Sequence, residues 1–164
     1  MDIRKVKKLI EMLKEIRLDT KFLIRQKDRI TSRKSRIISD QQQVIRYDRE
    51  STDEISDLSQ SKIIQTFKEV VSDYDLILLS DYGKGVLSFN LTQSLISIAN
   101  TKNKKILVDP KGVDFSKYKG AYLITPNKKE ASEATHIEIQ DEKSLNDAIK
   151  KLKQQLELNV SVIT

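Results

Sequence analysis

The sequence predicts an α/β fold in which the strands of a mostly parallel sheet alternate with helices. Four short apolar runs have the length and composition of buried parallel strands: Leu76–Leu79, Ile106–Val108, Ala121–Ile124 and Val160–Ile163. Helical spacing of apolar residues recurs between the first and second runs, and again between the third and fourth. Because strands that alternate with helices form βαβ units, the second half of the chain is expected to build one sheet with helices packed on it.

The first third of the chain has a different pattern, which begins with an amphipathic helix. From Asp2 to about Arg17, apolar residues recur at helical spacing with lysines and glutamates between them. Three β-like stretches follow, at Lys21–Arg25, Arg33–Ser39 and Gln43–Tyr47, and the last two are rich in alternating polar and apolar residues. We therefore expect a small, half-exposed sheet in this region.

The remaining elements connect this small sheet to the four apolar runs. Asp48–Leu58 is typical of a loop, and it leads into a helix over Ser59–Val71. Further helices are expected over Leu91–Ala99 and Leu145–Leu156, whereas the link from Val108 to Ala121 is expected to be irregular. No helical pattern follows the last apolar run, so we expect a domain cut short, with an exposed apolar end.

Composition places the chain among folded proteins without disulfides or membrane spans. Hydrophobic residues make up 38% and charged residues 33% of the 164 residues, and no cysteine is present. No apolar run approaches the roughly 20 residues that a membrane-spanning helix needs, and the N-terminus lacks the apolar region of a signal peptide. These features predict a cytoplasmic protein with no membrane partner.

The net charge of +6 is concentrated in the first third of the chain. Met1–Arg49 holds 15 Lys and Arg against 7 Asp and Glu, which leaves 15 against 17 in the rest. Such a basic region can bind nucleic acid, but it can equally attract a phosphorylated sugar or ATP, or only keep the protein in solution. Because no base-reading or stacking motif accompanies it, we expect no nucleic-acid partner. An affinity for nucleic acid that falls steeply with salt would support that alternative.

Polar residues follow each predicted strand at the end where a ligand site is expected. Asp81 comes directly after the first apolar run, Asp109 after the second, Thr125 and Asn127 after the third, and Thr164 after the last. In open α/β sheets, ligands bind outside the carboxyl ends of the strands. The sequence therefore predicts a site at this edge of the sheet.

Two glycine-containing loops at this edge carry candidate substrate contacts. In Asp81-Tyr82-Gly83-Lys84-Gly85, the glycines allow a sharp turn, and Asp81 and Lys84 could orient a polyhydroxyl substrate. In Asp109-Pro110-Lys111-Gly112, Lys111 is available to a phosphate oxygen. Composition alone leaves open the alternative that both segments are ordinary turns, because glycine and proline often simply punctuate loops.

The segment after the third run has two interpretations that can hold together. Asn127 and Glu130 match a capping box, in which each side chain accepts a hydrogen bond from an otherwise unpaired amide at a helix start. The same oxygens, one helical turn apart, could hold the water shell of Mg²⁺ beside the phosphates of ATP. His136 is the single histidine and has no cysteine to share a metal with, so we interpret it as structural. Serine-hydrolase and thiol chemistry are set aside because they lack a histidine pairing or a cysteine.

A resemblance to a known family rests on motifs that occur in a fixed order. The motifs are Leu79–Leu87, Val108–Gly112, Asp114–Ala121 and Thr125–Glu130, preceded by Lys34–Ile38 and Gln41–Asp48. Together they resemble the D-glycero-β-D-manno-heptose 7-phosphate kinases, which are ribokinase-like, or phosphofructokinase B type, sugar kinases. The resemblance implies a three-layer sandwich with a central, mostly parallel sheet and a small β lid, incomplete at both ends. Residues 1–164 would form a partial kinase domain, with the lid at about 20–50 and the central α/β part at about 59–164.

The resemblance also implies a reaction, cofactors and site residues. Kinases of this family transfer the γ-phosphoryl of ATP to the C1 hydroxyl of heptose 7-phosphate, on the route to ADP-heptose for lipopolysaccharide. The family's ATP and Mg²⁺ element is matched by Asn127, Lys128, Lys129 and Glu130. Of these, Asn127 and Glu130 would act on the metal through its water. The walls of the cleft for the sugar phosphate are matched by Asp81, Lys84, Asp109 and Lys111. The β lid would form the surface of a homodimer.

The chain departs from the family at two places that matter for catalysis. Its sequence has neither the glycine-rich sugar-binding region that precedes these motifs nor the Gly-Ala-Gly-Asp motif that follows them. The aspartate of that motif is the base in the family and is expected beyond Thr164, so no residue present is assigned as catalytic. General-base help is worth roughly 10²–10⁴-fold, so we expect little or no activity from the chain alone. The alternative is a non-catalytic module that binds a nucleotide or sugar phosphate.

Overall fold

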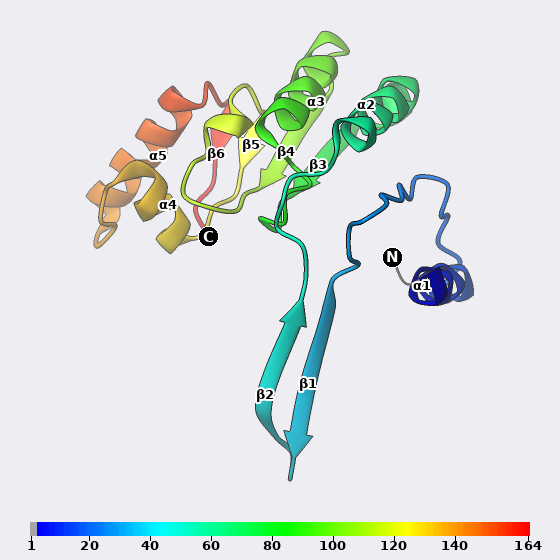
Figure 1. Cartoon of the computed structure of the whole chain (residues 1–164). Helices are drawn as coiled ribbons and strands as arrows, with labels where there is room; N and C mark the ends of the chain where they lie inside the picture. Colours follow the sequence, from blue (N-terminus) through cyan, green and yellow to red (C-terminus); the bar gives the residue numbers. More distant parts are fainter. Residues whose placement is uncertain (1–2) are drawn as a thin grey trace.

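The computed structural model describes residues 3–164, and in this range the body of the protein is built on a parallel sheet of four strands (Figure 1). Their bounds are β3 Leu76–Ser80, β4 Lys105–Asp109, β5 Leu123–Ile124 and β6 Val160–Ser161. The strands lie side by side in this order, and each neighbouring pair is parallel. Every predicted apolar run therefore overlaps a strand of the predicted sheet.

Helices connect these strands and cover one face of the sheet. The helices and 3₁₀ turns of this region are α2 (Asp57–Val70), η1 (Val71–Asp73), α3 (Phe89–Thr101), η2 (Ser116–Tyr118), α4 (Lys128–Thr135) and α5 (Glu142–Gln155). α3 joins β3 to β4, η2 lies in the predicted irregular link between β4 and β5, and α4 and α5 join β5 to β6. The strands are added to the sheet in one direction, from β3 to β6. Because crossovers between parallel strands are right-handed, all these connections lie on the same side of the sheet.

The two faces of the parallel sheet are buried to different extents. The face toward the helices carries a row of register partners that are all buried: Leu79, Val108 and Ile124. Burying one such side chain stabilises the fold by about 1.5–3 kcal/mol. Because successive strand residues point to opposite faces, the other face carries the preceding row: Leu78, Leu107 and Leu123. Leu78 is 62% exposed and its two neighbours are half-buried, so this face is partly open in the described part of the chain.

Each of the longer helices in this region begins at a residue whose side chain accepts a hydrogen bond from a helix amide. These N-caps are Ser56 for α2, Ser88 for α3, Asn127 for α4 and Asp141 for α5. Such a cap is worth about 1 kcal/mol relative to alanine. His136 follows the last residue of α4 with a left-handed φ of 53°.

The N-terminal third forms a helix and a β-hairpin that projects away from the parallel sheet (Figure 1). α1 (Ile3–Glu15) confirms the predicted amphipathic helix, whose expected start at Asp2 lies outside the described residues. β1 (Arg33–Ser39) and β2 (Gln42–Arg49) pair antiparallel, which confirms the second and third predicted stretches. Apolar side chains of the hairpin stay in solvent, as Ile38 shows with 64% of its surface exposed.

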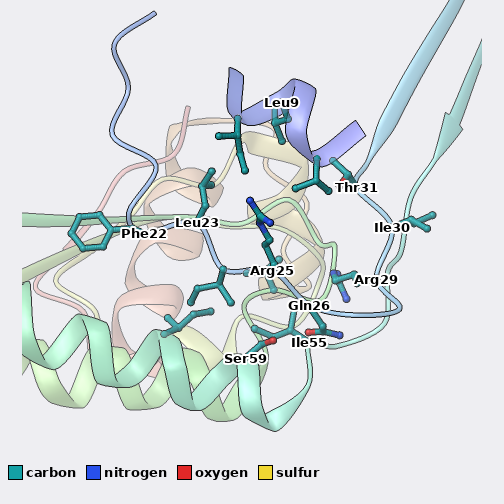
Figure 2. Close-up of a pocket in the computed structure, with 15 residues that line it drawn as sticks. Leu9, Phe22, Leu23, Arg25, Gln26, Arg29, Ile30, Thr31, Ile55 and Ser59 are labelled. Carbon is teal, nitrogen blue, oxygen red and sulfur yellow. The ribbon is translucent and has the colours of Figure 1, made fainter. Parts of the chain in front are cut away.

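The strand predicted over Lys21–Arg25 is wrong. This segment is a turn followed by irregular chain, so within the described residues the small sheet has two strands and not three. Its apolar residues Phe22, Leu23 and Ile24 instead line a groove of about 360 Å³, together with residues of α1 and α2 (Figure 2). These three side chains are 44%, 46% and 37% exposed, so the apolar character that suggested a strand belongs to the wall of an open groove.

Candidate functional site

A polar cleft of about 320 Å³ lies at the carboxyl ends of the parallel strands. Its lining comes from the segments that follow the strands: Asp81, Tyr82, Asp109, Pro110, Lys111, Thr125, Asn127, Glu130 and Thr164. Polar residues therefore gather at the predicted edge of the sheet, where ligands bind in folds of this class. The groove of Figure 2 differs in character, because none of the described residues that line it is an aspartate or a glutamate.

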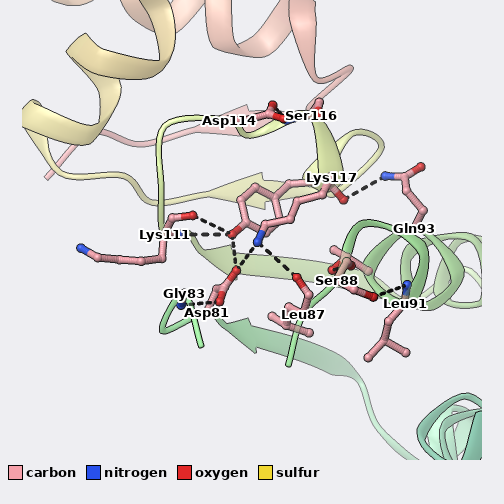
Figure 3. A network of polar contacts seen from close by, with 12 residues as sticks. Asp81, Gly83, Leu87, Ser88, Leu91, Gln93, Lys111, Asp114, Ser116 and Lys117 are labelled. Atoms are coloured by element: carbon pink, nitrogen blue, oxygen red, sulfur yellow. Dashed lines mark hydrogen bonds and ion pairs between the residues drawn. The ribbon is translucent and has the colours of Figure 1, made fainter. Parts of the chain in front are cut away.

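Asp81 forms part of the cleft wall, and its carboxylate is held by neighbouring donors (Figure 3). Oδ1 accepts a hydrogen bond from the Gly83 amide at 2.7 Å. Oδ2 accepts from Lys117 Nζ at 2.6 Å and from the Tyr118 hydroxyl at 2.7 Å. Burial alone would raise the pKa of the Asp81 carboxyl, but the bonds from Lys117, Gly83 and Tyr118 outweigh burial and lower this pKa below its ordinary value of 3.8. Asp81 is therefore ionised at neutral pH and already engaged with the protein.

Lys111, Asn127 and Glu130 meet at the start of α4. Asn127 Oδ1 accepts from the Glu130 amide at 2.9 Å, and Glu130 Oε2 accepts from the Asn127 amide at 3.1 Å, which confirms the predicted capping box. The other carboxylate oxygen, Oε1, pairs with Lys111 Nζ at 2.8 Å. Burial raises the pKa of Glu130, but Lys111 and the Asn127 amide lower it more, to below the ordinary 4.5. The helix start thus presents a paired carboxylate beside a lysine that is half exposed.

Asp109 supplies an exposed carboxylate at the cleft. It is the last residue of β4, and its Oδ2 accepts from Ser80 Oγ at 3.4 Å, at the end of the neighbouring strand β3. Its backbone carbonyl accepts from the Asp81 amide at 2.9 Å, which fixes the two strand ends beside each other. Asp109 is consequently more accessible to a ligand than Asp81.

Three predicted lysines lie outside the cleft lining. Lys84 Nζ pairs with Glu50 Oε1 at the base of the hairpin. Lys129 points to solvent, 3.7 Å from Glu133 on the next turn of α4, and Lys128 is also exposed. Of the predicted set, the structure brings together Asp81, Asp109, Lys111, Asn127 and Glu130.

Lys117 and Tyr118 are residues of the site that the sequence analysis left without a role. Both lie on η2, inside a motif of the resemblance, but their distance from Asp81 along the chain predicts no contact. Burial raises the pKa of the Tyr118 hydroxyl far above its ordinary value of 10.0, so this hydroxyl stays protonated and can donate to Asp81. The sequence does offer one signal for them. Lys117 and Tyr118 lie in the irregular link between β4 and β5, which passes the strand ends where the site was expected.

The oxygen atoms of the cleft suit a hydrated divalent cation. Within residues 3–164, no group of three or more His, Cys, Asp or Glu is placed to hold a metal ion directly. Asp109, Asn127 and Glu130 nevertheless present hard oxygen atoms to one cleft, and Mg²⁺ bound by few carboxylates usually keeps several waters. The residues present therefore fit a magnesium ion held through water.

The fold and the cleft together define an α/β protein with a ligand site at the carboxyl edge of a parallel sheet. The family of this protein follows from comparison with known sequences. The family model of the pfkB carbohydrate kinases matches residues 6–164, so the chain belongs to this family. The match includes both the hairpin and the parallel sheet, so these two regions are parts of one kinase fold.

Curated relatives agree with this family. The chain is 54% identical over 156 residues to the bifunctional protein HldE of Aliarcobacter butzleri, which covers 95% of this chain and 33% of that protein. It is 50% identical over 158 residues to the bifunctional protein HldE of Wolinella succinogenes, which covers 96% of this chain and 33% of the relative. The chain thus spans about a third of the length of these relatives. The matches confirm the predicted family resemblance.

Solved structures show the same fold at low sequence identity. The crystal structure of Sa239 has a TM-score of 0.66 and 15% identity, over 92% of this chain and 48% of its own. Phosphofructokinase-2 from Escherichia coli, in its tetrameric inhibited form, has a TM-score of 0.56 and 18% identity, over 73% of this chain and 40% of its own. These matches confirm the predicted ribokinase-like α/β class, and the described residues contain a parallel sheet of four strands and one helical layer of it. All helices within residues 3–164 are too short or too polar to span a bilayer.

Proposed function

We propose that this chain carries the nucleotide-facing part of a heptose 7-phosphate kinase, which transfers the γ-phosphoryl of ATP to the C1 hydroxyl of D-glycero-β-D-manno-heptose 7-phosphate. The main support is that Asp109, Lys111 and Glu130 converge on one cleft in a carbohydrate kinase fold. The motifs Leu79–Leu87, Val108–Gly112 and Thr125–Glu130, which resemble those of the heptose 7-phosphate kinases, favour heptose over other sugars. Transfer between these substrates depends mainly on positioning and charge stabilisation, which polar residues at strand ends can supply.

The polar groups around α4 have distinct roles in this proposal. The Lys111 ammonium attracts the phosphates of ATP, because a point charge at the positive end of a helix dipole favours anions. Asp109, Asn127 and Glu130 would hold Mg²⁺ through its water, and the ion would supply positive charge that neutralises phosphate charge. Lys111 would exchange the Glu130 carboxylate for a phosphate oxygen, and Glu130 Oε1 would then be free to accept another hydrogen bond.

The chain alone is proposed to bind these ligands without turning them over. Its sequence contains no Gly-Ala-Gly-Asp motif, which supplies the base in the family that it resembles. Asp81 cannot replace that base easily, because Lys117 and Tyr118 occupy its carboxylate and a carboxyl with a lowered pKa is a weak base. The kinase assignment and the alternative of a non-catalytic binding module therefore make the same prediction for residues 1–164. Both predict ligand binding without product formation.

Calorimetric titration with ATP, with and without Mg²⁺, tests the nucleotide site. Glu130→Gln keeps an oxygen that can accept from the Asn127 amide, so the capping box survives, but it loses the negative charge. We expect the Mg²⁺-dependent affinity for ATP to fall about tenfold or more. Glu133→Gln, beside Lys129 on the same helix, is the matched control and should bind like the unchanged chain. Equal affinities for Glu130→Gln and the unchanged chain would reduce Glu130 to a capping residue.

Phosphorus NMR with ATP and D-glycero-β-D-manno-heptose 7-phosphate tests for turnover. We expect no 1,7-bisphosphate from the 164-residue chain, beside an intact kinase that forms it. Product above background would show that residues 1–164 contain a working base. Asp109 would then be the first candidate, because its carboxylate is exposed at the cleft.

We also propose that the β1–β2 hairpin is a lid through which two subunits associate. Register pairs Ile37 with Ile45, and Tyr47 lies two residues further along β2 on the same face. These side chains are 61%, 52% and 65% exposed, which makes an apolar face suited to a partner. Analytical ultracentrifugation should show a dimer that Ile45→Lys dissociates. A chain that stays monomeric at high concentration would contradict this proposal.

A further inference from the structure

A polar junction that is buried at Asp81 and Tyr118 joins segments on both sides of the cleft. It consists of Asp81, Gly83, Lys111, Lys117 and Tyr118, and we call it the Asp81 junction (Figure 3). The side chain of Asp81 is 3% exposed and that of Lys117 is 20% exposed, while Tyr118 is fully buried. These groups are shielded from water, so their hydrogen bonds are stronger than bonds on the surface and more costly to leave unmade.

The bonds of the junction run from one cleft loop to the other. Asp81 Oδ1 accepts from the Gly83 amide, which shapes the loop after β3. Asp81 Oδ2 accepts from the Tyr118 hydroxyl, and the oxygen of that hydroxyl accepts from the Lys111 amide at 3.2 Å in the loop after β4. Lys117 Nζ donates to Asp81 and also to the carbonyl of Leu87 at 3.2 Å, close to the start of α3.

We infer that Lys117 and Tyr118 are positioning residues, which hold Asp81 and thereby fix the loops Asp81–Leu87 and Asp109–Gly112 relative to each other. The Lys111 backbone is part of this junction, and the Lys111 side chain reaches Glu130 at the cleft. The junction therefore fixes the backbone from which the Lys111 side chain extends, and with it the position of the Lys111 ammonium before a ligand binds. The consequence for ligand binding rests on the proposed function, whereas the coupling of the two loops does not.

The burial of Asp81 argues against a direct role of its carboxylate in holding a substrate. A ligand hydroxyl that took over Oδ2 would have to displace Lys117 or Tyr118 from a bond of 2.6 or 2.7 Å. Leaving a buried ammonium or hydroxyl without a partner costs more than one ordinary hydrogen bond contributes. Asp81 consequently shapes the cleft wall, and a ligand meets the backbone and the side chains that it positions.

Amide exchange measured by NMR on the 164-residue chain tests this inference without any ligand. Tyr118→Phe keeps the buried ring and removes only the hydroxyl. The Gly83 amide does not bond to Tyr118, so a change there is transmitted through the other members of the junction, Asp81 and Lys111. We expect Gly83 exchange to accelerate about tenfold, while the amide of Val108 in the sheet keeps its rate. Lys119→Met, which removes a surface lysine paired with Glu157, is the control and should leave both rates unchanged.

A second variant and a second signal complete the test. In Lys117→Met, the carbon resonance of the Asp81 carboxyl should titrate at a higher pH than in the unchanged chain, and Lys117→Arg should restore part of the difference.

Mg²⁺-ADP, used as the probe, should bind more weakly to Tyr118→Phe than to Lys119→Met. An unchanged Gly83 rate in Tyr118→Phe, or acceleration at Gly83 and Val108 alike, would overturn the inference. Failure of the unchanged chain to bind Mg²⁺-ADP would count against the proposed function and leave the exchange result standing.

Discussion

The parallel-sheet region, residues 57–164, and the N-terminal third, residues 3–49, are ordered by different interactions. In the parallel-sheet region, apolar residues such as Ile124 are fully buried, and even the buried carboxylate of Asp81 has charged and neutral donors. In the N-terminal third, the hairpin leaves Ile38 and Val44 at 64% and 66% exposure. A two-stranded hairpin is marginally stable in water by itself, so its position depends on the contacts at its base.

Those contacts at the base of the hairpin come from the loop that walls the cleft. The Arg29 guanidinium donates to the carbonyl of Asp53 at 2.6 Å and to the carbonyl of Lys84. The Lys84 ammonium in turn pairs with Glu50, just after β2. The parallel-sheet region therefore has its own hydrophobic core, whereas the hairpin is held in position by polar contacts to the loop Asp81–Gly85.

The largest expected effect tests whether stability resides in the parallel-sheet region. Ile124→Ala removes a fully buried side chain from β5 and should lower the free energy of unfolding by about 2–5 kcal/mol. Ile38→Ala on the hairpin should change this free energy by about 0.5 kcal/mol or less, because the side chain is exposed. Urea denaturation measures both values. Similar losses in the two variants would contradict the division between the regions.

The next effect concerns the contact between Gly85 and the segment that joins the two regions. This glycine has a φ of 70°, and an added Cβ would overlap the carbonyl oxygen of Asp53. Gly85→Ala should therefore lower the free energy of unfolding by about 1–3 kcal/mol, since the backbone is both strained and overpacked. Gly112→Ala is the control, because it also has a positive φ, of 96°, but has open space around the added atom. If urea denaturation shows equal losses, the close approach at Gly85 is irrelevant.

A smaller effect is expected when the base of the hairpin loses its clamp. Arg29→Met removes the guanidinium from the carbonyls of Asp53 and Lys84, which should cost about 1–2 kcal/mol. Amide exchange should accelerate in β1 and β2 and stay unchanged in β4. Arg33→Met, on the exposed surface of β1, is the matched control. Acceleration in β4 as well would show that the two regions unfold together.

The smallest expected effect is a loss of thermal stability at acidic pH. The pKa of Asp81 is lowered in the folded chain, so its ionised form contributes stability that is present above the ordinary value of 3.8. This stability is lost as the pH falls through the lower pKa of the folded state. Thermal unfolding between pH 7 and pH 2 should show a decline in the midpoint below about pH 4, and Asp81→Asn should flatten part of it. An equally steep decline in Asp81→Asn would assign the acid sensitivity to other carboxyls, such as Glu130.

The sequence predicted the elements whose signal is local. Short apolar runs such as Ile106–Val108 identify the parallel strands, because a strand that is covered by helices consists mainly of consecutive apolar residues. The capping box of Asn127 and Glu130 was also predictable, since it depends on residues three positions apart. The prediction of a strand over Lys21–Arg25 was wrong because an apolar segment that lines a groove and a short strand have the same composition.

Contacts between distant residues could not be predicted in this way. Lys84 was assigned to the cleft from its place in a glycine loop, but its partner Glu50 is 34 residues earlier in the chain. Asp81 was recognised as a wall residue, yet nothing local shows that Lys117 and Tyr118, more than 35 positions later, occupy its carboxylate. Both outcomes follow from how the chain crosses the strand ends, which only the folded arrangement determines.

The Glu130 carboxylate gives the cleft a built-in reporter. One of its oxygens accepts from the Asn127 amide and the other pairs with the Lys111 ammonium, so the two contacts share a single delocalised charge. Any event that draws Lys111 away will change the electron density on the oxygen that faces Asn127. The amide resonance of Asn127 should therefore shift as the cleft fills, and it offers a label-free signal for screening nucleotides and sugar phosphates on this chain.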